Sequence, residues 1–225
     1  MEFLQDVISF VIHIDVHLRA MIDSYGAWTY AILFFIIFAE TGLVVTPFLP
    51  GDSLLFAAGA LSAGSSLDPF WLFIILTVAA IVGNITNYWI GYYVGPGIIQ
   101  KGRVRFIRKE YLERTHRFYE KHGGKTIVFA RFIPIIRTFA PFVAGLGFMS
   151  YGRFMFFNIV AGAAWVGIFI FGGYYFGNIP VVKNNFTIVI AAIIIISSIP
   201  PVIEVLRQRK HITGNRPESG KPSNG

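Results

Sequence analysis

Charged residues are scarce in this sequence, and cysteine is absent. Only 14% of its 225 residues are charged, against about a quarter in ordinary soluble domains, and 55% are hydrophobic. Together with a mean hydropathy of +0.62, this composition disfavours a soluble protein. Without cysteine the chain offers no disulfide framework, no thiolate metal site and no cysteine nucleophile.

Motifs of the common enzyme classes are missing as well. The sequence has no G-x-S-x-G, no Walker A motif and no G-x-G-x-x-G before a helix, which argues against a serine hydrolase, an ATP-driven pump and a dinucleotide enzyme. His116, His122 and His211 show no paired metal-binding spacing. The first 25 residues lack a basic n-region and an A-x-A cleavage site, so they are no cleavable signal peptide. We therefore expect no enzyme, no cofactor and no metal.

Long apolar stretches indicate an all-α integral membrane protein. Residues 70–100 and 154–182 carry no charge, and each exceeds the roughly 20 residues that cross a hydrocarbon core about 30 Å thick. A third apolar stretch, residues 186–203, is just long enough to span. These stretches predict transmembrane helices over 70–95, 154–182 and 186–206.

The basic residues set the expected orientation. Nine of the nineteen Lys and Arg lie between Lys101 and Lys125, and five more follow from Arg207 onward. By the positive-inside rule both segments are cytoplasmic. The formal charge of +7 therefore reflects membrane orientation, and we expect no nucleic-acid partner.

The segment 126–150 is interrupted in its middle and does not resemble a simple span. If it crossed the membrane, the two spans that follow would place the basic tail outside, so we predict a re-entrant hairpin that returns to the cytoplasm. The breaks and charges in this hairpin come from Arg131, Pro134, Arg137 and Pro141.

The segment 28–64 offers a counterpart that enters from the opposite side, because the connection around Asp68 contains no Lys or Arg. Its interruptions come from Glu40, Pro47, Pro50, Gly51 and Asp52. A weak echo joins the two hairpins, since F-L-P precedes Ala58-Gly59 in the first and F-I-P precedes Ala144-Gly145 in the second. We therefore predict an inverted repeat of the kind that many transporters use.

The predicted organisation has three parts. An interfacial amphipathic helix over 1–27 precedes the membrane domain, and a disordered cytoplasmic tail over 208–225 follows it. The membrane domain, 28–207, consists of the hairpin 28–64, the span 70–95, a basic cytoplasmic segment 101–125, the hairpin 126–150 and the spans 154–182 and 186–206.

Four ionisable residues fall inside the hairpins, and each costs roughly 2.5–3.5 kcal/mol at the centre of an inserted helix. The arginines present planar forks that bind phosphate bidentately, and the carboxylates are able to exchange a proton or a sodium ion. Their charges sum to zero, so the alternative is that they form ion pairs which only lock the hairpins together. The four are Glu40, Asp52, Arg131 and Arg137.

Two motifs carry a resemblance to a known family. P-F-L-P-G-D-S-L-L-F-A-A-G over 47–59, with Glu40 before it, and F-A-R-F-I-P-I-I-R-T-F-A-P-F-V-A-G over 129–145 resemble the DedA family of SNARE-associated or VTT-domain membrane proteins. The resemblance implies two opposed hairpins, a bacterial inner-membrane location and a functional role for the acidic pair and the arginine pair. One departure is the segment 83–95, where many members carry an Asp near Asn84 and an Arg near Tyr92.

The function that the resemblance implies is lipid translocation. The first choice is a flippase that recycles undecaprenyl phosphate, driven by the proton or sodium gradient, with Glu40 and Asp52 for coupling and Arg131 and Arg137 for the phosphate. The alternatives are a phospholipid flippase or scramblase, a membrane-embedded lipid-modifying enzyme, and a structural or chaperone-like protein. The expected partners are a polyprenyl phosphate or phospholipid and H⁺ or Na⁺, and a homo-oligomer stays open.

Overall fold

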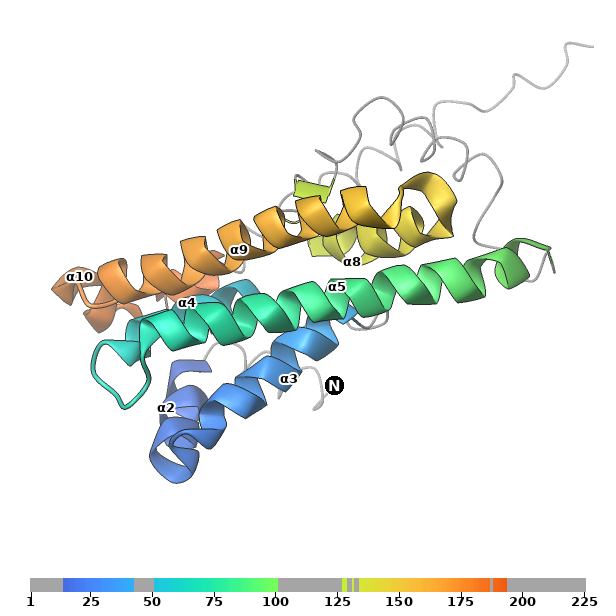
Figure 1. Cartoon of the computed structure of the whole chain (residues 1–225). Helices are drawn as coiled ribbons and strands as arrows, with labels where there is room; N and C mark the ends of the chain where they lie inside the picture. The colour runs from blue at the N-terminus through green and yellow to red at the C-terminus, as the bar shows by residue number, and fades with distance from the viewer. Residues whose placement is uncertain are drawn as a thin grey trace, which may run out of the picture.

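The computed structural model describes residues 14–42, 51–100, 127–128, 131, 134–186 and 188–193, and these residues contain helices and no strand. Its two longest helices are α5 (Pro69–Gln100) and α9 (Tyr151–Phe176), which pack against each other and run in opposite directions (Figure 1). Both are long and apolar enough to cross a membrane, since an 18-residue stretch within Pro69–Val94 has a mean hydropathy of 2.0 and one within Tyr151–Phe176 has a mean hydropathy of 2.1. The prediction of an all-α chain with long apolar helices is confirmed.

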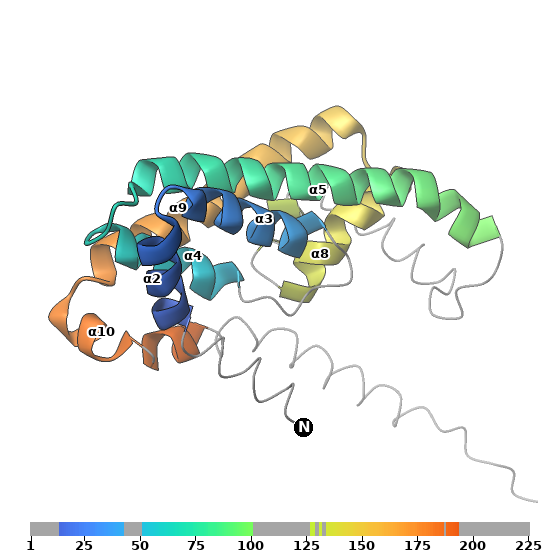
Figure 2. The ribbon, with the colours of Figure 1, turned by 90° about the horizontal axis from the view of Figure 1, so that it is seen from below.

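Shorter helices pack around this pair. They are α2 (Ile14–Tyr25), α3 (Trp28–Gly42), α4 (Gly51–Ser62), α8 (Pro134–Val143), the π-helical turn η1 (Ala144–Phe148) and α10 (Pro180–Asn184). The helix α3 lies along α5, α4 lies along α9, and α8 with η1 lies along α5 (Figure 2). The two helices of the predicted hairpin 28–64 therefore pack on different long helices, α3 on α5 and α4 on α9.

Helix α9 ends earlier than the predicted span 154–182. It begins at Tyr151 and ends at Phe176, and Pro180 then opens α10. The side chain of Asn178 donates to the carbonyls of Tyr174, at 3.0 Å, and Ala60, at 3.2 Å. The helix ends here because Asn178 satisfies a terminal carbonyl and Pro180 cannot donate a backbone hydrogen bond.

The remaining predicted segments are described only in part. Helix α5 covers the predicted span 70–95 and continues to Gln100. Within the segment 1–27, α2 buries Ile14, Leu18 and Ile22 against α3 and α4, which gives this helix an apolar face. The segment 101–125, the tail 208–225 and most of the span 186–206 lie outside the described residues.

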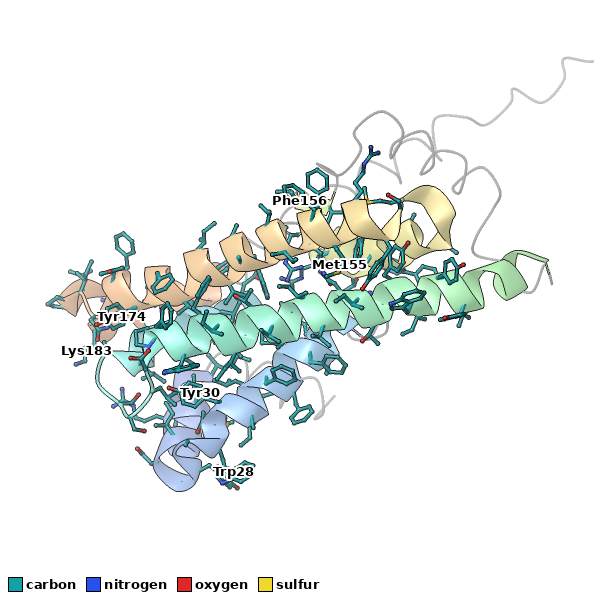
Figure 3. The ribbon with its side chains drawn as sticks, viewed as in Figure 1. Trp28, Tyr30, Met155, Phe156, Tyr174 and Lys183 are labelled. Carbon is teal, nitrogen blue, oxygen red and sulfur yellow. The ribbon has the colours of Figure 1, made fainter. Side chains whose placement is uncertain are left out.

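Exposed aromatic side chains lie near both ends of Pro69–Val94, the apolar part of α5. Trp71 is 59% exposed near its start and Tyr92 is 50% exposed further along, about 30 Å away at 1.5 Å per residue. Tryptophan and tyrosine favour the two interfaces of a bilayer, and this separation matches the thickness of its hydrocarbon core. Between the ends, apolar residues such as Phe156 of α9 point away from the bundle (Figure 3). Lipid is the natural neighbour of this surface.

Two pairs of glycines allow the short helices to approach the long ones closely. A Cβ on Gly59 of α4 would lie 2.1 Å from the carbonyl oxygen of Ile170, and one on Gly173 of α9 would lie 2.1 Å from that of Phe56. Such distances exclude any side chain, as in other helix pairs that meet through small residues.

The same arrangement recurs between α5 and η1. A Cβ on Gly91 would lie 2.1 Å from the carbonyl oxygen of Phe142, and one on Gly145 would lie 2.0 Å from that of Tyr88. The two interfaces therefore follow one rule. Each glycine contacts a carbonyl on the opposite helix, and this carbonyl belongs to the residue three positions before that helix's own glycine.

Gly173→Ala is expected to destabilise the protein strongly, because the new methyl group would force α4 away from α9. The cost should reach roughly 1–3 kcal/mol, typical of overpacking, and lower the melting temperature in detergent. Gly172→Ala is the matched control, since a Cβ at Gly172 would meet no atom within 4 Å. Alanine is also about 1 kcal/mol more favourable than glycine inside a helix, so this variant should be at least as stable as the parent. Equal melting temperatures for the two variants would contradict the close contact.

Candidate functional site

A layer of buried polar residues separates two apolar clusters of the bundle. One cluster gathers α2, α3, α4 and residues 72–80 of α5, and the other gathers Tyr88, Ala140, Ala144 and Phe154. Buried polar groups are costly in an apolar interior unless they are paired, so a layer of them within a membrane bundle indicates a functional site. The layer contains Glu40, Asn84, Asn87, Arg131, Arg137, Thr138 and Asn158, with Asp52 beside them.

Arg137 of α8 lies between the two carboxylates. Its Nη2 donates to Oε1 of Glu40 in a short contact, and its Nη1 donates to Oδ1 of Asp52 at 2.9 Å. The exposed fractions of the three side chains are 5% for Arg137, 1% for Glu40 and 15% for Asp52. This arginine therefore joins α3, α4 and α8 through charge-assisted hydrogen bonds.

The carboxylate of Glu40 lies against the N-terminus of α4. Its Oε1 accepts a hydrogen bond from the backbone N–H of Gly51 at 3.2 Å, and the positive end of the helix dipole favours a negative group there. A Cβ on Gly51 would lie 2.0 Å from Oε2 of Glu40, so any larger residue here would displace the carboxylate from its present position. That same Oε2 has no hydrogen-bond partner among the described residues.

Arg131 is buried without a carboxylate partner in the described part of the chain. It is 2% exposed, and its Nη1 donates to Oδ1 of Asn158 at 3.4 Å. Its Nε and Nη2 make no hydrogen bond there. A buried ionised guanidinium is costly unless its nitrogens are hydrogen-bonded, and within the described residues two of the three nitrogens of Arg131 are not.

Trp165 of α9 contacts both arginines. Its ring centroid lies 5.1 Å from the guanidinium carbon of Arg131 and 4.7 Å from that of Arg137. Its indole N–H donates to Oδ1 of Asp52 at 2.9 Å. The indole is fully buried and links three of the four charged residues.

Three asparagines extend the layer beyond the charges. The amide of Asn84 donates to Oδ1 of Asn158 at 2.8 Å, and that of Asn158 donates to the carbonyl of Ile81 at 3.1 Å. The amide of Asn87 donates to the carbonyl of Thr138 at 2.6 Å. The two long helices are thus joined by side-chain hydrogen bonds at the level of Arg131.

The comparisons with known proteins agree with the motifs. A family profile described as the VTT domain matches residues 49–175. Protein DedA of Escherichia coli (strain K12) is 50% identical over 212 residues, which cover 93% of this chain and 97% of that protein. The chain belongs to the DedA family. No solved structure matches it.

Two further members of the DedA family show how far the similarity extends. A membrane protein of Mycobacterium tuberculosis (strain CDC 1551 / Oshkosh) is 42% identical over 175 residues, 76% of each chain. The inner membrane protein YqjA of Escherichia coli (strain K12) is 38% identical over 152 residues, which cover 68% of this chain and 69% of that protein. The chain is therefore a membrane protein of this family.

The four charged residues predicted for this DedA-family site all lie in the polar layer, with Arg137 bridging Glu40 and Asp52. No group of three metal-ligating residues exists among those the structure describes. Of the predicted departures from the family pattern, Asn84 is buried beside Asn158, whereas Tyr92 is half exposed on α5.

The predicted hairpin breaks have different outcomes. Gly51 and Pro134 each begin a helix, α4 and α8, whereas Pro47 and Pro50 lie outside the described residues. Pro141 does not break the chain, which corrects that prediction: it lies inside α8, and the helix continues through the π-helical turn η1. One proline removes a single backbone hydrogen bond, and the neighbouring turns tolerate the loss.

Sequence reasoning missed Trp165, Asn158 and Asn87. Both asparagines interrupt long apolar stretches, which is a usable signal, because a buried amide needs a partner within the membrane. Trp165 gave no such signal, since one more aromatic residue in an apolar helix is ordinary. Only the fold places its ring beside two arginines.

Proposed function

We propose that this DedA-family protein translocates a lipid that bears a phosphate group, and that Arg131 receives the phosphate. The observation that carries the proposal is the Arg131 side chain, buried beside Arg137 with two unused donors in the described part of the chain. A planar guanidinium fork binds phosphate oxygens bidentately and stays charged at any accessible pH. The arrangement binds an anion and needs no nucleophile, so we propose a transporter and no enzyme.

The charges suggest how an ion gradient would drive this transport. With both carboxylates ionised, the four charged residues are neutral together, and a bound phosphate would leave the buried site negative. Protonation of Glu40, or a sodium ion at its Oε2, which has no hydrogen-bond partner among the residues that the structure describes, would restore neutrality. Substrate and coupling ion would then favour each other's binding, and this linkage is reciprocal.

The lipid that we propose first is undecaprenyl phosphate, because the resemblance to the DedA family implies it. A proteoliposome assay that follows undecaprenyl phosphate and phosphatidylglycerol separately tests this choice. Selective movement of undecaprenyl phosphate supports it. Equal movement of both lipids would indicate a scramblase, and movement of neither would refute the proposed function.

We further propose that the two hairpin segments are re-entrant and related as an inverted repeat. The reciprocal glycine contacts support this, since Gly59 and Gly173 pack α4 on α9 in the way that Gly145 and Gly91 pack η1 on α5. In such repeats, the substrate site lies where the broken helices meet. Here, the N-terminal turns of α4 and α8 meet through Asp52 and Arg137.

The orientation that we propose places Arg153 inside and both Asp68 and Lys183 outside. Lys183 lies at the end of the bundle where α5 begins (Figure 3). Arg153 lies in the first turn of α9, a helix whose last residue, Phe176, precedes Lys183 by seven residues. Single cysteines at these three positions should react with an impermeant maleimide from opposite sides of the membrane, and the cysteine-free chain provides the blank. Labelling of all three from one side would refute the orientation.

A further inference from the structure

Trp165 holds a position in the site that its apolar surroundings do not require. It is fully buried on α9, its ring contacts both guanidinium groups, and its N–H donates to Asp52. A tryptophan that only filled the core would need one hydrogen-bond partner and no cation. Here, one indole contacts both Asp52, proposed for ion coupling, and Arg131, proposed for phosphate binding.

The two guanidinium groups beside this ring repel each other, and only Arg137 has carboxylate partners in the described part of the chain. The negative face of an indole attracts cations, and the attraction is stronger when the pair is removed from water. Without the ring, Arg131 would gain most by moving onto Glu40 or Asp52. Each guanidinium would then be neutralised by a carboxylate, and no uncompensated positive charge would remain for an anion.

We propose that Trp165 is a positioning residue: its ring keeps the Arg131 guanidinium beside Arg137 and off the carboxylates, while its N–H fixes Asp52. The inference rests on the proposed function, because it concerns how the same site stays open for a phosphate. It adds that the affinity of the site depends on an aromatic ring as well as on the two arginines.

A spectroscopic test uses the native Trp165 as its own reporter. The other three tryptophans, Trp28, Trp71 and Trp89, are at least 36% exposed, so replacing them with phenylalanine leaves a single-tryptophan protein. Dodecyl phosphate in detergent micelles is expected to change the emission of Trp165 saturably, because a bound phosphate adds negative charge beside the two guanidinium groups that contact the ring. Dodecanol, which lacks the phosphate, should not change this emission. A protein that keeps Trp28 as its single tryptophan should show no change of emission with either compound.

A binding test compares two substitutions by equilibrium binding of dodecyl phosphate. Trp165→Leu should weaken binding about tenfold or more, because both cation–ring contacts are lost. Trp165→Phe should keep most of the affinity, because it retains a ring and loses only the N–H bond to Asp52. Trp28→Leu is the control, since Trp28 is 72% exposed and begins α3, at the opposite end of that helix from Glu40 (Figure 3).

The outcomes separate this inference from the proposed function. If the parent protein binds dodecyl phosphate but the emission of Trp165 does not change, or Trp165→Leu binds like the parent, the positioning role is refuted and the transporter proposal stands. If Trp165→Leu fails to fold, the single-tryptophan titration still decides. If the parent does not bind dodecyl phosphate at all, the phosphate site itself is refuted, and the inference falls with it.

Discussion

Arg131→Lys is expected to lower the transport of a phosphate-bearing lipid by about tenfold to a hundredfold, although the charge is kept. An ammonium cannot reproduce the fork that engages two phosphate oxygens, and each charge-assisted hydrogen bond contributes roughly 1.5–3 kcal/mol. The fold should change little, since Arg131 has one weak hydrogen bond, 3.4 Å long, among the described residues. Initial transport rates in proteoliposomes, at matched protein levels, provide the measurement.

Arg137→Lys should impair transport and also lower the melting temperature. One lysine cannot bridge Glu40 and Asp52 in the geometry of the two guanidinium nitrogens, so a buried carboxylate loses a charge-assisted hydrogen bond at a cost of about 1.5–3 kcal/mol. Arg153→Lys, at an exposed position, is the control for both variants. Parental transport rates for both Arg131→Lys and Arg137→Lys would remove the argument for a phosphate.

The charged residues of the site were predictable because each is costly in a membrane. Glu40, Asp52, Arg131 and Arg137 stand in otherwise apolar segments, and insertion energies alone single them out. Their arrangement was not predictable. The sequence offered two carboxylate–guanidinium pairs, whereas Arg137 takes both carboxylates and Arg131 has none in the described part of the chain. That asymmetry depends on helix positions, which spacing along the chain does not determine.

The long helices were predictable for the same physical reason. Uncharged stretches that exceed the bilayer thickness become α5 and α9, and the errors fall at their ends, where Asn178 and Pro180 stop α9. The packing of the short helices could not be predicted from the sequence. The Ala58-Gly59 and Ala144-Gly145 pairs suggested a repeat, yet only the fold shows that Gly173 and Gly91 face them across the helix interfaces.

Glu40→Gln is expected to separate transport from the ion gradient. Glu40 is 1% exposed and its Oε2 has no partner among the described residues, so this oxygen is the candidate for the proton or sodium ion. Glutamine still accepts from the backbone of Gly51 but cannot exchange a proton. The parent should transport faster under an imposed pH or sodium gradient, whereas Glu40→Gln should respond to neither.

The pH dependence of binding gives a second readout of the same coupling. If anion binding favours a proton on Glu40, the affinity of the parent for dodecyl phosphate should rise as pH falls, because the complex takes up a proton. In Glu40→Gln this rise should be smaller. The comparison between the two proteins cancels the titration of the phosphate itself, which has a second pKa of about 6.

Asp52→Asn distinguishes coupling from ion pairing. Asp52 accepts from Arg137 and Trp165 through one oxygen, Oδ1, which asparagine retains, so this variant should fold and keep part of its response to the gradient. Loss of transport alone would decide nothing, because an unpaired arginine in the bilayer also destabilises the fold by several kcal/mol.

Transport rates are therefore compared with and without each gradient, on folded variants at parental membrane levels. If the parent responds to neither gradient, and both Glu40→Gln and Asp52→Asn transport at parental rates, the carboxylates serve only as ion-pair partners of the arginines and the coupling hypothesis fails.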